Sequence, residues 1–261
     1  MKKFLYRFIY CILILIIIFC SIYIYNFIKS RQEAEEESNL INTIIVNETH
    51  INDSSSNNLE NENERILKVK KLKEMNEDIV GWLEIKGTEI SYPVLQGTDN
   101  LYYMTHNYKK EKSKNGSIFL DKDYDWNIKS NNLLMYGHNL NNGKMFQDLL
   151  KYKDEGYYKK HKIIRFTTDN EDNEYEIMAV FKSRVYYKSE KNVFRYYQFI
   201  NPKSEKEYNE FVENSKKASL YDTKVDSEYG DELITLSTCS YHTEDGRFAV
   251  VGLKKVKKKE E

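Results

Sequence analysis

The chain begins with a run of apolar residues long enough to cross a membrane. Residues 8–25 read FIYCILILIIIFCSIYIY and contain no charged side chain. A helix of this length spans about 27 Å, close to the thickness of the hydrocarbon core of a bilayer. The run is long for the apolar region of a signal peptide, and no small-x-small cleavage site follows it. We therefore expect residues 1–30 to form a cytoplasmic N-terminus and a single transmembrane anchor.

The charges around this run predict its orientation and the character of the next segment. Lys2, Lys3 and Arg7 precede the run, which favours a cytoplasmic N-terminus and places the rest of the chain outside the cell. Residues 32–64 hold nine Asp or Glu, no Lys or Arg, and one short apolar patch. Such a segment buries too little apolar surface to offset its chain entropy, so we predict an acidic, disordered stalk over residues 31–63. The alternative is that residues 41–46 form a strand of the following domain.

From residue 64 to residue 261 the pattern is that of a folded domain. Apolar residues at helical spacing predict an amphipathic helix over residues 66–79. Short runs rich in β-branched and aromatic residues then predict eight strands. These runs cover residues 82–85, 90–94, 117–121, 133–136, 162–168, 175–183, 232–238 and 247–256. Two segments between them read as helical, residues 144–152 and 203–217. The fold is therefore predicted to be mainly β with flanking helices, as a closed or nearly closed β-barrel.

Charge and cysteine content exclude several function classes. The 261 residues include 40 Lys or Arg against 41 Asp or Glu, without the basic excess of a nucleic-acid binder. Two of the three cysteines lie in the apolar run, so the folded domain has one thiol, Cys239, and no disulfide scaffold. No CxxC, HExxH or close His/Asp cluster is present. We expect neither a metal site nor a cofactor.

Three residues combine the chemistry of a cysteine nucleophile. Cys239 ends a predicted strand, and Arg247 begins the next one, so a hairpin would bring the guanidinium beside the thiol. A nearby cation favours the thiolate and can also stabilise an oxyanion. His138 ends the strand NLLMYGH in a turn, which suits a general acid or base. His242, three residues after Cys239, is the rival proton carrier.

These motifs resemble those of the sortases, the cysteine transpeptidases of Gram-positive cell surfaces. TLSTCSYHTEDGRFAVVGL is similar to their active-site hairpin, with TLxTC followed by an Arg on the next strand, and YGHN matches their histidine motif. DIVGWLEIKGTEISYPVLQ, the DN dipeptide at residues 99–100 and NGSIFLD resemble the class B branch in particular. The resemblance implies a sortase-like eight-stranded β-barrel with an N-terminal helix and a helical insertion before the cysteine strand.

The resemblance also implies roles for individual residues. Cys239 would attack the carbonyl after the Thr of a C-terminal sorting signal, and His138 would protonate the departing amine, leaving a thioester acyl-enzyme. Arg247 would hold the substrate carbonyl and the oxyanion. The helix over residues 203–217 would help to build the peptide pocket. Three substrate-groove positions carry over: Ser237, Tyr136 and Asn100. For these three, ordinary barrel packing or strand and turn chemistry is an equally good explanation.

The implied partners are surface proteins and the cell wall. The surface proteins would bear an NPxTN-like or PxTG-like sorting signal, and the acceptor would be an amine of a peptidoglycan precursor or cross-bridge. Two other classes are consistent with the residues. One is a different extracytoplasmic cysteine hydrolase or amidase, which would release its product to water. The other is a non-enzymatic surface domain in which Cys239 is a small buried hydrophobic residue.

Overall fold

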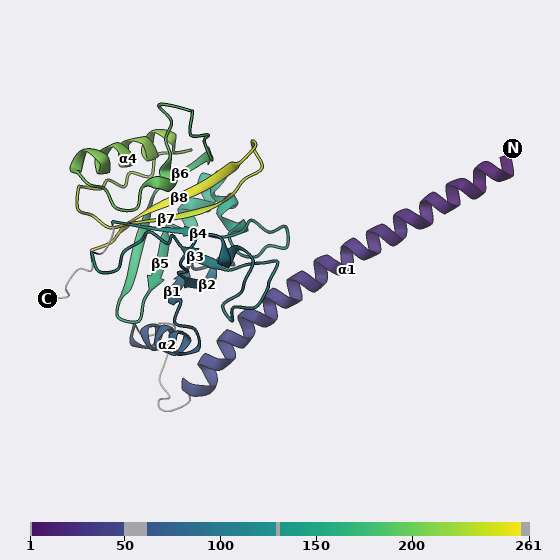
Figure 1. Ribbon diagram of the computed structural model, residues 1–261, viewed down its shortest axis with the longest axis horizontal. Helices are drawn as coiled ribbons and strands as arrows, with labels where there is room; N and C mark the ends of the chain where they lie inside the picture. Colours follow the sequence, from purple (N-terminus) through teal and green to yellow (C-terminus); the bar gives the residue numbers. More distant parts are fainter. Residues whose placement is uncertain (1, 50–61, 129–130, 257–261) are drawn as a thin grey trace. The chain divides into compact units, whose positions relative to one another are not determined.

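A computed structural model describes residues 2–49, 62–128 and 131–256 of the chain (Figure 1). The chain divides into two compact units, Met1–Ile51 and Asn52–Glu261.

The first unit is one helix, α1, which spans Lys2–Thr49. Its segment Tyr6–Lys29 is long and apolar enough to cross a membrane, with a mean hydropathy of 2.8. The apolar run predicted as an anchor lies within this segment. The helix continues through residues 31–49, where the sequence predicted a disordered stalk. The chain has no Gly or Pro before Gly81, and Glu, Gln, Ala and Arg in this stretch are good helix formers. Residues 50–61 of the predicted stalk lie outside the described residues.

The second unit is a closed barrel of eight strands in the order β1-β2-β3-β4-β7-β8-β6-β5 (Figure 1). Each strand overlaps one of the eight predicted from the sequence, so the predicted barrel is confirmed. The strands are β1 Ile79–Glu84, β2 Ser91–Leu95, β3 Ile118–Leu120, β4 Asn132–Tyr136, β5 Ile163–Thr167, β6 Asp172–Arg184, β7 Leu233–Cys239 and β8 Gly246–Lys254.

Helical segments connect and flank the strands. The α-helices are α2 Glu62–Met75, α3 Glu155–Lys160 and α4 Glu205–Ala218, and the 3₁₀ helices are η1 Tyr102–Met104, η2 Gln147–Lys153 and η3 Tyr196–Gln198. The insertion predicted over residues 203–217 is α4, and Ser204 caps its N-terminus by accepting a hydrogen bond from the Glu207 amide. The segment predicted as helical over residues 144–152 is the shorter 3₁₀ helix η2.

The helix before the barrel differs from its prediction at both ends. It begins at Glu62 and ends at Met75, because Ile79 already belongs to β1. Only Val69 and Leu72 of its apolar residues are buried. The pattern therefore identified the helix correctly but not its two ends.

The barrel core and one pair of parallel strands position the chemistry. Every strand contributes buried apolar side chains to one continuous core. Strands β4 and β7 are parallel, with Tyr136 opposite Ser237, so their carboxyl ends meet at the same end of the barrel. Strand β8 returns antiparallel to β7 and places Arg247 opposite Cys239. The hairpin pairing expected from the sequence is therefore present.

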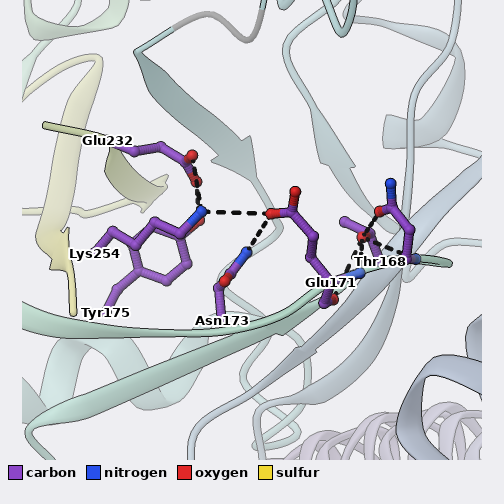
Figure 2. Close-up of polar contacts among 7 residues, drawn as sticks. Thr168, Glu171, Asn173, Tyr175, Glu232 and Lys254 are labelled. Carbon is purple, nitrogen blue, oxygen red and sulfur yellow. Dashed lines mark hydrogen bonds and ion pairs between the residues drawn. The ribbon is translucent and has the colours of Figure 1, made fainter. Parts of the chain in front are cut away.

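A cluster of polar contacts lies at the other end of the barrel (Figure 2). The Nζ of Lys254 lies 3.1 Å from a carboxylate oxygen of Glu232 and 3.5 Å from one of Glu171. The Tyr175 hydroxyl also donates to Glu232, and burial, followed by the charge of Glu232, raises the pKa of Tyr175. These contacts join the start of β7 and the end of β8 to the β5–β6 turn. They hold the strands together at the end opposite Cys239.

Candidate active site at the end of the cysteine strand

A cavity of about 240 Å³ lies where β4 and β7 end. All six residues predicted to form the site line it: Cys239, His138, Arg247, Ser237, Tyr136 and Asn100. They come from three strand ends and from the loop before η1. The fold thus brings together residues separated by more than a hundred positions in the chain.

Cys239 is the last residue of β7, and its thiol is free and half-buried. The side chain amide of Asn139 donates to the backbone carbonyl of Cys239 at 3.1 Å. Because Asn139 directly follows His138, this bond ties the histidine motif to the cysteine strand. A second tie comes from Thr238, whose hydroxyl donates to the carbonyl of Gly137 at 2.8 Å. The thiol therefore stands at the edge of the cavity on a fixed backbone.

Arg247 is half-buried beside the thiol at the start of β8. Its Nη1 donates to the backbone carbonyls of Gly246, at 3.0 Å, and Asp245, at 3.2 Å. Among the described residues, no carboxylate forms an ion pair with this guanidinium. The turn before it requires a glycine, since a Cβ on Gly246 would lie 2.0 Å from the Ser240 carbonyl oxygen. The hairpin thus presents an un-neutralised cation to the cavity.

His138 is held by a backbone carbonyl rather than by a carboxylate. Its Nε2 lies 2.7 Å from the carbonyl oxygen of Met104, in η1. A carbonyl can only accept, so Nε2 carries a proton, and in the neutral ring Nδ1 is the basic nitrogen. No hydrogen bond to Nδ1 is found in the described part of the chain. The imidazole is therefore oriented with one nitrogen available for proton transfer.

The rival histidine lies elsewhere. His242 is exposed in the β7–β8 turn and does not line the cavity; its Nδ1 contacts the Ser240 hydroxyl at 3.0 Å. Burial, followed by the charges of Lys182 and Lys153, lowers the pKa of His242. Of the two candidates, His138 is the one that shares the cavity with Cys239.

The three predicted groove residues are engaged in hydrogen bonds. The Tyr136 hydroxyl and the Asn100 amide each donate to Oδ2 of Asp121 at 2.9 Å. Burial, followed by the Asp121 charge, raises the pKa of Tyr136, which stays a neutral phenol at physiological pH. On the neighbouring strand, Ser237 lies opposite Tyr136, and its hydroxyl is 2.7 Å from that of Tyr196. The polar groups of the groove wall are thus held in fixed positions by these hydrogen bonds.

Several further lining residues were not assigned to the site from the sequence. They are Met104, Phe119, Val185, Tyr196, Tyr197 and Thr238. Met104, Tyr196 and Tyr197 lie in the short 3₁₀ helices η1 and η3, and chain pattern does not predict where such a segment folds against a barrel. Asp121, which lies behind the groove, is part of the NGSIFLD motif, but nothing in that motif assigned it a partner.

Helix α4, expected to help build the pocket, supports it from behind. None of its residues is among those that line the cavity. Its Phe211 stacks on Phe199 with ring centroids 3.9 Å apart and also contacts Phe194 at 5.7 Å. These two partners flank η3, which carries Tyr196 and Tyr197 into the cavity wall. The helix therefore positions the wall without touching a ligand in it.

No group of three or more His, Cys, Asp or Glu side chains in the described ranges is arranged to hold a metal ion. The chemistry available in the cavity is that of a thiol, an imidazole and a guanidinium.

Comparison with known proteins connects this geometry with a family. Residues 83–255 match the sortase domain. The chain is 37% identical to sortase B of Listeria monocytogenes over 183 residues, which cover 69% of this chain and 71% of that protein. It is 34% identical to sortase B of Staphylococcus aureus over 182 residues, with the same coverage of each chain. The solved substrate complex of the S. aureus enzyme has the same fold, with a TM-score of 0.70 at 24% identity, over 88% of this chain and 98% of that one.

Proposed function

The chain belongs to the sortase family, in its class B branch, and is a cysteine transpeptidase; we propose that it cleaves a C-terminal sorting signal after Thr and transfers the surface protein to a peptidoglycan amine. One observation carries the proposal. Cys239 lies opposite Arg247 across β7 and β8, in a cavity that also holds His138. This arrangement supplies a nucleophile, an anion-stabilising cation and a proton carrier.

In the first step the Cys239 sulfur attacks the carbonyl carbon that follows the Thr of the signal. The Arg247 guanidinium, with no ion-pair partner in the described residues, stabilises the negative charge that develops on the carbonyl oxygen. The C–N bond then breaks, and protonated His138 gives its proton to the departing amine. The products are a thioester on Cys239 and a free amine that carries the C-terminal part of the signal.

In the second step an amine of a peptidoglycan precursor or cross-bridge attacks the thioester. Neutral His138 removes a proton from this amine, the C–S bond breaks, and the thiolate of Cys239 is restored. The bond from Nε2 to the Met104 carbonyl leaves Nδ1 as the nitrogen that gives and takes the proton. A carbonyl orients the ring without adding the negative charge that an Asp supplies in the serine triad.

The proposed cellular placement rests on the apolar segment of α1. The segment Tyr6–Lys29 is long and apolar enough to span a bilayer. We infer that it is an uncleaved anchor with a cytoplasmic N-terminus, so the barrel faces outward, where surface proteins and peptidoglycan are found. Digestion of intact cells with protease tests this orientation, and a barrel that stays protected would refute it.

The partners are proposed from the family and from the shape of the site. The S. aureus relative has been solved with a substrate bound, which supports a peptide as the ligand of the corresponding cavity here. We propose surface proteins with an NPxTN-like or PxTG-like signal as substrates. The groove formed by Asn100, Tyr136 and Ser237 would select among them.

The test uses the full-length protein in detergent and two quenched fluorescent peptides. One contains Asn-Pro-Gln-Thr-Asn and the other Leu-Pro-Glu-Thr-Gly, each incubated with and without an amine acceptor. A background with Cys11→Ser and Cys20→Ser leaves Cys239 as the one thiol, so mass spectrometry can locate the acyl-enzyme. We expect cleavage after Thr, an acyl group on Cys239 and transfer to the amine. Cys239→Ala and His138→Ala should abolish all three.

Two outcomes would contradict the proposal. Product formation that is indifferent to the added amine would identify a hydrolase or amidase. A Cys239 thiol that resists alkylation in the folded protein would favour a non-enzymatic domain.

A further inference from the structure

We propose that Asp121 determines the hydrogen-bonding polarity of the substrate groove, by fixing Tyr136 as an acceptor and Asn100 as a donor toward the bound peptide. Asp121 does not line the cavity and would act through these two residues as a positioning and specificity-determining group. The proposal rests on the proposed function, because it takes the occupant of the groove to be a peptide.

Asp121 lies behind the groove at the end of β3 and is 3% exposed. Its Oδ2 accepts two hydrogen bonds at 2.9 Å, from the Tyr136 hydroxyl and from the Asn100 Nδ2. Its Oδ1 accepts from the backbone amide of Asp123, also at 2.9 Å. Both carboxylate oxygens are therefore held, and the side chain cannot rotate without breaking one of these bonds. A buried carboxylate with several donors is a rigid anchor.

The carboxylate fixes the direction of the bond from Tyr136. An ionised carboxylate can only accept, so the single hydroxyl proton of Tyr136 is committed to Asp121. The phenol oxygen then has only lone pairs to offer to the cavity that it lines. Toward a ligand, Tyr136 is thus a hydrogen-bond acceptor.

The orientation of Asn100 is fixed in the same way. Its Oδ1 accepts from the backbone amide of Lys122 at 2.8 Å, and its Nδ2 donates to Asp121. These two bonds settle which end of the amide is which and occupy one of the two Nδ2 protons. The second proton is the group that Asn100 can offer to the cavity, so toward a ligand Asn100 is a donor.

The pair defines the chemistry of the ligand. Because both groups bond to the same oxygen of Asp121, their polar atoms are no farther apart than twice 2.9 Å. A donor and an acceptor at this spacing match the C=O and N–H groups of an extended peptide segment or a side-chain carboxamide. An amide in place of Asp121 could donate as well as accept, so the polarity of Tyr136 would no longer be fixed.

The first test is a double-mutant cycle in the full-length protein, with Asp121→Asn, Tyr136→Phe and the combined variant. We expect each single change to raise KM for the sorting peptide by about tenfold, the value of one hydrogen bond, while kcat changes less than about threefold. The combined variant should raise KM by less than the product of the two single effects, because both changes affect the contact that Tyr136 makes with the ligand. The alkylation rate of Cys239 should stay at the wild-type value.

The matched control is Asp148→Asn. Asp148 is as buried as Asp121, at 3% exposed, and is also held by a backbone amide, that of Glu89 at 3.1 Å, but it does not line or adjoin the groove residues. We expect Asp148→Asn to lower the melting temperature without raising KM. If it raises KM as Asp121→Asn does, the effect reflects general destabilisation and the proposal fails.

The second test does not depend on whether Asp121 variants fold. Sorting peptides are prepared in which one backbone amide at a time is replaced by an ester, which removes its N–H. At one position the ester should raise KM of the wild-type enzyme about tenfold and leave KM of Tyr136→Phe unchanged. The proposal is overturned if no position separates the two enzymes, or if Asp121→Asn folds and retains the wild-type KM. Failure of the wild-type enzyme to form any acyl-enzyme would refute the proposed function instead.

Discussion

Replacing Arg247 by Ala should remove most of the activity while leaving the barrel folded. Arg247 is half-buried, and its hydrogen bonds go to two backbone carbonyls, those of Asp245 and Gly246. Neither carbonyl is charged, so the substitution leaves no buried ion without a partner. We therefore expect the free energy of unfolding to fall by about 1 kcal/mol or less.

The effect on catalysis should be much larger than this. In the proposed mechanism Arg247 stabilises charge that exists only when Cys239 has attacked the carbonyl. Losing one such contact typically lowers kcat by about 100-fold or more, equivalent to about 3 kcal/mol. Arg247→Lys should recover part of the loss, because it keeps the charge but not the planar array of donors. The loss should appear in kcat and in kcat/KM rather than as a change in KM alone.

The assay follows release of a quenched fluorophore and the amount of acyl-enzyme by mass spectrometry, beside a thermal melt of each variant. Normal kcat/KM in Arg247→Ala would refute the assigned role. A variant that loses its cooperative melt together with its activity would show that Arg247 supports the hairpin rather than the reaction.

Three further predictions address the support of the site and the stability of the barrel. Tyr196→Phe should lower the free energy of unfolding by about 1–3 kcal/mol, because it leaves the buried Ser237 hydroxyl without its partner. Adding Ser237→Ala should recover part of this loss, as measured by denaturant unfolding. Additive losses in the double variant would contradict the pairing. Gly116→Ala should lower turnover more than stability, because φ of Gly116 is +61° and a Cβ there would lie 2.6 Å from the Met104 carbonyl oxygen, which holds the His138 ring. Unchanged turnover would refute this. Burial raises the pKa of Asp172, but hydrogen bonds from Arg65 and Thr167 outweigh burial, so the pKa of this carboxyl is lowered overall. The ionised Asp172 therefore stabilises the fold above about pH 4, and this stabilisation is lost as the pH falls further. Urea titrations of the wild type and Arg65→Met should therefore differ most near pH 7 and converge in acid, and a constant difference would exclude this linkage.

The sequence was sufficient for the elements whose signals lie close together in the chain. All eight strands were predicted, because a run rich in β-branched and aromatic residues is a property of a few consecutive positions. The pairing of Cys239 with Arg247 was also predicted, because a hairpin of eight residues leaves little choice of register. His138 could be placed at a strand end because it directly follows the run NLLMYG along the chain.

The structure differs from the prediction in part of the segment that follows the apolar run. Acidic composition suggested disorder over residues 31–63, yet α1 continues to Thr49. A high net charge indicates that a segment cannot form a hydrophobic core of its own. Whether the segment can continue an existing helix depends instead on helix propensity and on the absence of Gly and Pro. The helix predicted over residues 66–79 instead spans Glu62–Met75, because β1 begins at Ile79.

By itself, therefore, the sequence determined the eight strands, the apolar helix and the three residues that carry the proposed chemistry. Only the tertiary structure decided how these residues are held: the Met104 carbonyl on His138, the Asn139 amide on Cys239, and Asp121 between Asn100 and Tyr136. The physical reason is the distance along the chain between the residues that interact. Periodicity and motifs act over a few residues, whereas these hydrogen bonds join positions 15 to 100 residues apart. Such contacts exist only after the barrel has closed in one register.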